Sequence, residues 1–321
     1  MKKLDEILDG VTSVAVAGHV NPDGDCTGST MAVFLYLRDN YPQIQTDVYL
    51  ERKKADFDFI PEISAVKTVA ESGKKYDLLI LVDVSSADRV ALAGEYIETA
   101  GKTVCIDHHV TNSGFCMENH VIPDASSTCE VLCDLMEPEK ISADCAVALY
   151  TGIVTDTGVF QYSCTTPHTM RTAASLLEKG IPFSEIVEQA FYRKTYAQNQ
   201  LMGRTLMESI MLLEGKCIVG IVRQKEMDFY GLTPADMDGI VNQLRNTEGV
   251  EVAIFLYELE PQKFKVSMRS AEKVDVSRVA GMFGGGGHIR AAGCTMNGSP
   301  FDVVNNLTLY IEKQLLESDG M

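Results

Sequence analysis

The sequence lacks any apolar run long enough to cross a membrane. A membrane-spanning helix needs about 18–20 consecutive apolar residues, and no stretch of the 321 residues approaches that length. Residues 1–6 become acidic before any hydrophobic stretch begins, which is not typical of a secretory signal. We therefore expect a cytoplasmic protein without membrane contact.

Positive charge is also scarce. The chain has 28 Lys and Arg residues against 45 Asp and Glu residues, a net charge of −17. Of this excess, −14 lies in residues 1–214 and −3 in residues 215–321. Such a chain has no basic track for long duplex nucleic acid. A small anionic substrate stays open, because bound metal ions and a few cations can reverse the charge locally.

The nine cysteines do not indicate a disulfide framework. Their number is odd, their spacing is irregular, and several lie in apolar segments. This usage is typical of reduced, buried thiols.

Short apolar runs alternate with helical patterns up to about residue 185, which predicts an α/β fold. We expect buried parallel strands at 13–17, 46–50, 77–82 and 103–106. We expect helices at 28–39, 127–137, 142–154 and 168–180, the second opening with a capping box at Ser127. These elements predict a doubly wound, mainly parallel sheet domain over residues 1–183.

A second, smaller mixed α/β domain is expected over residues 209–321, after a helical connector at 184–208. Its expected strands are at 216–223, 250–258 and 262–269, and its helices at 233–246, 275–282 and 301–317. A chain of 321 residues is long enough to build two separate cores.

Acidic and histidine side chains gather at the ends of the apolar runs in the first domain: His19, Asp23 and Asp25; Asp83; Asp107, His108 and His109; and Asp156. Ligands of open α/β sheets bind outside the carboxyl ends of the strands, so these groups are expected to converge. Together they would repel one another unless divalent cations neutralised them. Taken singly, each group also fits a turn, a helix cap or a solvated loop.

The combined set contains carboxylates and imidazoles but no thiolate, which favours Mn²⁺, with Mg²⁺ or Co²⁺ as substitutes, over structural zinc. Asp83 has two oxygens and could bridge two ions. The side chains of His108 and His109 diverge, so one can bind metal while the other faces substrate. Two metal ions would polarise a phosphoryl group and activate water, which predicts phosphoester hydrolysis.

A glycine run in the second domain suggests an anion site. Gly285, Gly286 and Gly287 follow Gly284 and precede His288, so backbone N–H groups could approach a phosphate closely. Arg269 and Ser270, at the end of a predicted strand, offer a guanidinium fork and a hydroxyl to the same anion. The alternative is a flexible loop beside a solvated arginine.

These motifs resemble those of the DHH phosphoesterase superfamily, and the glycine run resembles its DHH-associated C-terminal domain. The resemblance spans residues 18–293. The size of the chain and its second domain are similar to the short-oligoribonuclease (nano-RNase) and pAp-phosphatase branch.

The resemblance implies that two Mn²⁺ ions per chain are held as follows: His19 and Asp23 at the first ion, Asp25, His108 and Asp156 at the second, and Asp83 between both. It also implies that His109 faces the scissile phosphate, as electrostatic stabiliser or proton donor, and that Asp107 orients the site. The terminal phosphate or nucleotide would be held from the second domain by six residues: Arg269, Ser270, Gly285, Gly286, Gly287 and His288.

The expected function is that of a Mn²⁺-dependent phosphodiesterase acting on very short RNA and on linear dinucleotides such as pApA, releasing nucleoside monophosphates. The enzyme is also expected to remove the 3′-phosphate of adenosine 3′,5′-bisphosphate (pAp). Two alternatives remain: a pAp phosphatase with little nuclease activity, and a non-catalytic nucleotide sensor. The resemblance is also compatible with a homodimer.

Overall fold

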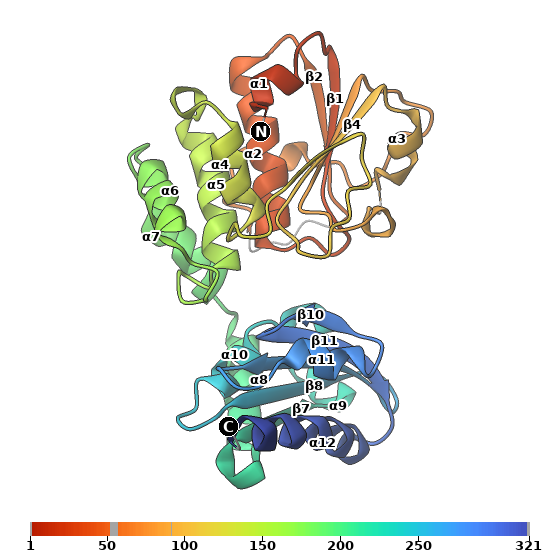
Figure 1. The fold of residues 1–321 in the computed structure, drawn as a ribbon, viewed down its shortest axis with the longest axis vertical. Coiled ribbons are helices and arrows are strands. Elements are labelled where there is room, and N and C mark those ends of the chain that lie inside the picture. The colour runs from red at the N-terminus through yellow and green to blue at the C-terminus, as the bar shows by residue number, and fades with distance from the viewer. Residues whose placement is uncertain (1, 52–56, 91, 320–321) are drawn as a thin grey trace. The chain divides into compact units, whose positions relative to one another are not determined.

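The computed structural model describes residues 2–51, 57–90 and 92–319 (Figure 1). The chain divides into two compact units, Met1–Arg193 and Lys194–Met321. The division falls inside the segment that the sequence predicts as a connector.

The first unit is built on a five-stranded parallel sheet with the order β2-β1-β3-β4-β5. The strands are β1 (Ser13–Ala17), β2 (Gln45–Tyr49), β3 (Leu78–Val82), β4 (Lys102–Asp107) and β5 (Glu118–Val121). The first four lie where the sequence predicts buried strands. The polar edge strand β5 was missed, because its Glu-Asn-His-Val sequence has no apolar run.

Helices cover both faces of this sheet, as a doubly wound domain requires (Figure 1). On β1, Val14 and Val16 pack into the core beneath the long helices, whereas Ala15 and Ala17 pack into a second core with Tyr96 of α3. This alternation follows from the two-residue period of a strand. The helices of the unit are α1 (Leu4–Ile7), α2 (Gly24–Asn40), α3 (Gly94–Thr99), α4 (Thr128–Leu135), α5 (Ala143–Asp156), α6 (Pro167–Leu177) and α7 (Phe183–Val187).

Helix α4 begins where the sequence places its cap, since the Ser127 side chain accepts a hydrogen bond from Glu130 N. The reciprocal half of the predicted capping box is absent, because the Glu130 carboxylate instead accepts a hydrogen bond from Ser126 Oγ.

The second unit contains a six-stranded mixed sheet with the order β10-β11-β9-β8-β7-β6. Its strands are β6 (Ile210–Leu212), β7 (Cys217–Val222), β8 (Val252–Glu260), β9 (Lys263–Ser270), β10 (Gly286–His288) and β11 (Ala291–Asn297). Its helices are α8 (Tyr196–Met207), α9 (Gln224–Tyr230), α10 (Ile240–Arg245), α11 (Val276–Gly281) and α12 (Pro300–Asp319).

The three predicted strands and the helices near 275–282 and 301–317 are present in this unit. The predicted helix 233–246 is shorter, because Gly239 adopts a φ of 91° before α10 begins. The sequence missed the short edge strands β6 and β10, and also β11 and α9.

Shorter helical turns connect several of these elements: Ile63–Ala65, Ala87–Arg89, Pro138–Lys140, Leu213–Gly215, Pro234–Asp236 and the π-helical turn Glu188–Tyr192. Within the described ranges, no helix has the length and apolar character that a membrane span requires. All nine cysteines are free thiols.

Candidate metal centre

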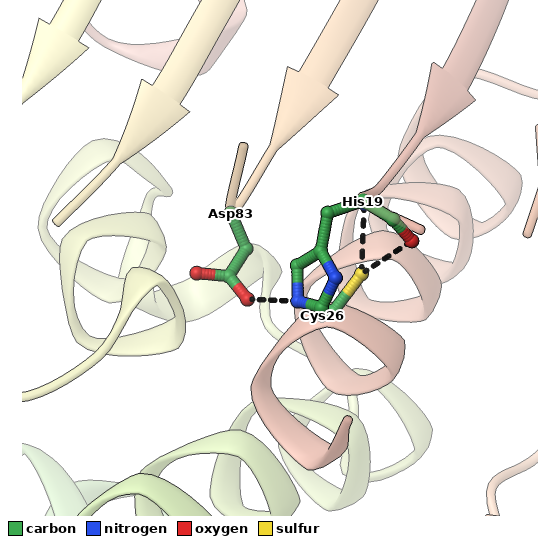
Figure 2. A group of neighbouring side chains, drawn as sticks. All are labelled: His19, Cys26 and Asp83. Carbon is green, nitrogen blue, oxygen red and sulfur yellow. Dashed lines mark hydrogen bonds and ion pairs between the residues drawn. The ribbon is translucent and has the colours of Figure 1, made fainter. Parts of the chain in front are cut away.

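The candidate site lies at the carboxyl ends of β1, β3 and β4. The chain leaves β1 for β2 on one side and later returns to β3 on the other, so the strand order reverses between β1 and β3. A crevice outside the strand ends at such a point is where α/β sheets bind ligands. Figure 2 shows His19 and Asp83 leaving the ends of neighbouring strands and pointing toward each other.

Asp83 stands at the centre of the cluster and is 2% exposed. Its backbone has a φ of 58°, a left-handed conformation that Asp tolerates better than most residues. Its Oδ2 lies 3.4 Å from His19 Nε2, and its Oδ1 lies 3.7 Å from His108 Nε2. The two oxygens of one carboxylate therefore face two different imidazoles.

The ring of His19 is oriented by the backbone. His19 Nδ1 lies 2.7 Å from the Val20 carbonyl oxygen, which can only accept, so we assign the proton to Nδ1. This orientation turns Nε2 toward Asp83 and toward Asp23, whose Oδ1 is 3.7 Å away. A guanidinium nitrogen of Arg89 approaches Nδ1 at the longer distance of 3.5 Å.

The second group of side chains comes from three separate elements. His108 Nε2 lies 3.2 Å from Asp156 Oδ2 and 3.9 Å from Asp25 Oδ2. The His108 ring is oriented like that of His19, since its Nδ1 lies 3.3 Å from the Ala125 carbonyl oxygen. Asp156 is the last residue of α5, so it reaches the site from a helix and not from a strand end.

The N-terminus of α4 holds two of the buried carboxylates. Thr128 N donates to Asp25 Oδ2 at 2.7 Å, and Cys129 N donates to Asp25 Oδ1 at 3.0 Å. The Thr128 hydroxyl donates to Asp83 Oδ1 at 3.0 Å. Unpaired N–H groups and the helix dipole both favour negative charge at this position. The helix therefore orients these two carboxylates.

The charges of this cluster are not balanced by the protein alone. Burial, together with the nearby Asp83 carboxylate, raises the pKa of Asp25 to about 7. Burial and the charge of Asp25 raise the pKa of Asp156 well above its usual range. Burial lowers the pKa of His19, but hydrogen bonds to Asp23 and Asp83 outweigh this effect and raise it. A divalent cation would relieve this crowding of carboxylates, so the donor set fits a metal centre.

His109 belongs to a separate hydrogen-bonded chain at the edge of the cluster. Its Nδ1 donates to Asp107 Oδ1 at 2.7 Å and lies 3.6 Å from Asp83 Oδ1. Burial lowers the pKa of His109, but its bond to Asp107 and the charge of Asp83 outweigh burial and raise it. Asp107 is fully buried, which raises its pKa, yet the bond from His109 brings the pKa below its usual value.

Three groups among the described residues bring metal-ligating atoms within 4.8 Å of one another: His19, Cys26 and Asp83; Asp83, His108 and His109; and Asp25, His108 and Asp156. Asp83 and His108 each occur twice, which connects the groups into one centre. Of the predicted metal ligands, Asp23 lies outside these groups. It caps α2, where its Oδ1 accepts from Cys26 N at 3.0 Å, and remains half-exposed.

The sequence did not single out Cys26, Thr128 or Asn112, which all contact this centre. Cys26 Sγ accepts a hydrogen bond from His19 N at 3.2 Å, as Figure 2 shows. The position of Cys26 directly after Asp25 could have indicated its proximity. Thr128 carried no such signal, since its partners Asp25 and Asp83 come from distant parts of the sequence. Asn112 lies only five residues after Asp107, so its proximity to that residue could also have been noticed.

The predicted anion-binding residues of the second unit lie at the end of β9, directly before β10 and on β10, and both strands pair with β11. Arg269 pairs in register with Ala291, and His288 lies exposed at the end of β10. Ser270 is buried and its hydroxyl donates to the Ile289 carbonyl oxygen at 3.4 Å.

Two glycines of the run are required by packing against β11. A Cβ on Gly285 would lie 2.2 Å from Gly293 O, and one on Gly287 would lie 2.5 Å from Ala291 O. Around Gly286 there is open space.

The convergence of carboxylates and imidazoles at the strand ends of a parallel sheet is typical of a metal-dependent hydrolase. Residues 13–153 match the DHH family, N-terminal domain, and residues 214–313 match the DHHA1 domain. The chain is 30% identical to the bifunctional oligoribonuclease and PAP phosphatase NrnA of Thermus thermophilus, over the whole of this chain and 95% of that protein. The protein therefore belongs to the DHH family of phosphoesterases and is a hydrolase.

Two further proteins are similar over most of the chain. The bifunctional oligoribonuclease and PAP phosphatase NrnA of Bacillus subtilis is 25% identical over 87% of each chain. The crystal structure of an exopolyphosphatase-related protein from Bacteroides fragilis superposes with a TM-score of 0.87, covering 97% of this chain and 95% of that one at 24% identity. This superposition confirms the α/β fold that the sequence predicts.

Proposed function

We propose that this protein is a Mn²⁺-dependent phosphodiesterase that hydrolyses very short oligoribonucleotides and linear dinucleotides to nucleoside monophosphates. We also propose that it removes the 3′-phosphate of pAp. The observation that carries the proposal is the position of Asp83, whose two oxygens face His19 and His108 at 3.4 and 3.7 Å. The names of the relatives from T. thermophilus and B. subtilis support the same substrates.

The proposed metal ligands are His19, Asp25, Asp83, His108 and Asp156, whose ligating atoms face one another. Asp23 is proposed as the sixth ligand from the rim of the site, since its Oδ1 lies 3.7 Å from His19 Nε2. Two bound Mn²⁺ ions would polarise the phosphoryl group and lower the pKa of an attacking water. Backbone carbonyls hold Nδ1 of His19 and His108, so both rings keep Nε2 toward the carboxylates. This arrangement is typical of imidazoles that bind metal.

His109 is the proposed partner of the reacting phosphate. Because Nδ1 donates to Asp107, the Nε2 atom of the ring is the one that would meet substrate. The imidazole then stabilises charge on the phosphate or gives a proton to the leaving oxygen. Asp107 acts by keeping the ring in this orientation.

In the second domain, we propose that Arg269, Ser270, Gly285–Gly287 and His288 bind the terminal phosphate or nucleotide. Gly286 leaves room for a ligand, because among the described residues no atom beyond its two chain neighbours lies within 4 Å of the position of its missing Cβ. A substrate of a few nucleotides needs only such local contacts, whereas a long strand needs a groove that tracks its backbone. The net charge of −17 agrees with the shorter substrate.

A product assay tests the proposal. 5′-labelled pApA and pAp are incubated with the protein in Mn²⁺, in Mg²⁺ and in EDTA. Asp83→Asn removes the central carboxylate charge, and Asp88→Asn serves as a control at an exposed acid on the neighbouring turn. We expect AMP from both substrates in Mn²⁺, and no product in EDTA or from Asp83→Asn. Calorimetric titration is expected to give two Mn²⁺ per chain.

Other outcomes of this assay would redirect the assignment. Hydrolysis of pAp alone would identify a phosphatase with little nuclease activity. Binding of both nucleotides without any product would identify a nucleotide sensor and refute the catalytic proposal.

A further inference from the structure

Asn112 lies outside the metal centre but contacts the residue that orients His109. It is half-buried in the loop that follows β4, five residues after Asp107. Its Nδ2 donates to Asp107 Oδ2 at 2.7 Å, while the other oxygen of that carboxylate accepts from His109 at the same distance. Asp107 is therefore held from both sides by a donor.

The orientation of the Asn112 amide is determined by its partners. Nδ2 also faces the Val84 carbonyl oxygen at 3.0 Å, and Oδ1 accepts from Gly114 N at 2.8 Å. A flipped amide would place Oδ1 against the Asp107 carboxylate and the Val84 carbonyl oxygen, and neither group can donate a hydrogen bond. Asn112 thus connects the loop after β3, which carries Asp83, with the Asp107–His109 pair.

The burial of Asp107 strengthens its hydrogen bonds with Asn112 and His109. Asp107 is fully buried, so its carboxylate depends on donors from the protein such as the Asn112 amide. Hydrogen bonds to a buried charged group are stronger than those between neutral groups, and losing one frees the acceptor to rotate. Any rotation of Asp107 would move the ring of His109 with it.

We propose that Asn112 is a positioning residue that aligns His109 for phosphoester hydrolysis through Asp107. The inference rests on the proposed function and goes beyond it, since it assigns a role to a side chain outside the predicted site. Asn112 neither touches substrate nor binds metal in this proposal. It acts only by keeping Asp107 in the rotamer that holds the imidazole.

The test is a double-mutant cycle between Asn112→Ala and His109→Ala, with pApA as substrate and saturating Mn²⁺. We expect Asn112→Ala to lower kcat about 10- to 100-fold, the usual cost of removing a supporting hydrogen bond. The KM and the Mn²⁺ affinity from calorimetry are expected to stay unchanged. In the His109→Ala background, Asn112→Ala should cause no further loss, because the group it positions is gone.

Asn119→Ala is the matched control, since the side chain of Asn119 forms hydrogen bonds with the backbone of Cys116 in the same loop. It should leave kcat unchanged. If Asn112→Ala does not fold, Asn112→Asp is used in the same cycle at pH 8, because it keeps the acceptor for Gly114 N and removes the donor. Additive losses in the cycle, or weaker Mn²⁺ binding, would overturn the proposal.

A readout independent of activity separates this inference from the proposed function. NMR of ring-¹⁵N-labelled histidine reports the hydrogen-bonded Nδ1–H of His109 directly. We expect this signal to be lost in Asn112→Ala and kept in Asn119→Ala. If the wild-type protein hydrolyses neither pApA nor pAp, the proposed function fails, whereas an unchanged His109 signal in Asn112→Ala refutes the inference itself.

Discussion

Replacing Thr128 by Val should weaken metal binding without removing any metal ligand. The two side chains have the same shape, so the substitution deletes only the hydroxyl that donates to Asp83 Oδ1 at 3.0 Å. Thr128 is fully buried, so no solvent molecule can take the place of the hydroxyl. The backbone N–H of Thr128, which holds Asp25, remains in place.

The expected magnitude follows from the charge of the acceptor. A hydrogen bond to a charged group contributes about 1.5–3 kcal/mol, and supporting bonds to metal ligands typically account for about 10- to 100-fold in affinity. Without the hydroxyl, Asp83 can rotate away from the position in which its oxygens face His19 and His108. We therefore expect Mn²⁺ to bind about 10- to 100-fold more weakly to Thr128→Val.

Calorimetric titration of Mn²⁺ into EDTA-treated, dialysed protein measures this effect, and thermal unfolding checks that the variant is folded. Thr128→Ser keeps the hydroxyl and is expected to bind Mn²⁺ like the wild type. A folded Thr128→Val with wild-type affinity would show that this hydrogen bond does not support the metal centre.

Three further predictions concern packing, substrate binding and pH. Gly152→Ala would place a Cβ 2.5 Å from Asp25 Oδ1; it should cost about 1–3 kcal/mol of stability in chemical denaturation and weaken Mn²⁺ binding. Gly203→Ala, in an open helical position, should instead stabilise by about 1 kcal/mol. Arg269→Ala should raise the KM for pApA about 10- to 100-fold while kcat changes little, since it removes a charged contact to phosphate; an unchanged KM would refute that role. An ion pair with the neighbouring strand lowers the pKa of Glu118 to about 2, so its stabilisation is present above the unfolded pKa and is lost as the pH falls through 2. Glu118→Gln should lower the unfolding free energy by about 0.2–1 kcal/mol at pH 7, and the difference should shrink below pH 4.5, whereas a difference that grows in acid would contradict the assignment.

The central strands β1, β3 and β4 of the first sheet were predictable because they are buried on both faces. Continuous apolar runs such as Leu78–Val82 have few alternatives to a central parallel strand. The edge strands β5 (Glu118–Val121) and β10 (Gly286–His288) lack this signal and were therefore missed. Their pairing is decided by the backbone of a neighbouring strand and not by their own side chains.

The residues of the candidate site came from local motifs and their grouping around two ions from the family resemblance, but the hydrogen bonds that hold them in place could not be predicted. A carboxylate after an apolar run is visible in the sequence, and so is an adjacent histidine pair. The hydrogen bond between Asp25 and Thr128 joins positions 103 residues apart. The sequence near either residue gives no indication of this contact. For the same reason, Asp156 was grouped with the strand ends although it arrives at the end of α5.

The sequence by itself determined the fold class, the scarcity of positive charge and the chemical identity of the donor groups, because these depend on composition and on short periodic patterns. Only the tertiary structure decided which donors face one another, which ring nitrogens are held by carbonyls, and that α4 presents its N-terminus to two carboxylates. Those features arise when the crossover from β1 to β3 brings separate strand ends together at one edge of the sheet. Burial there lowers the local dielectric constant and strengthens each hydrogen bond.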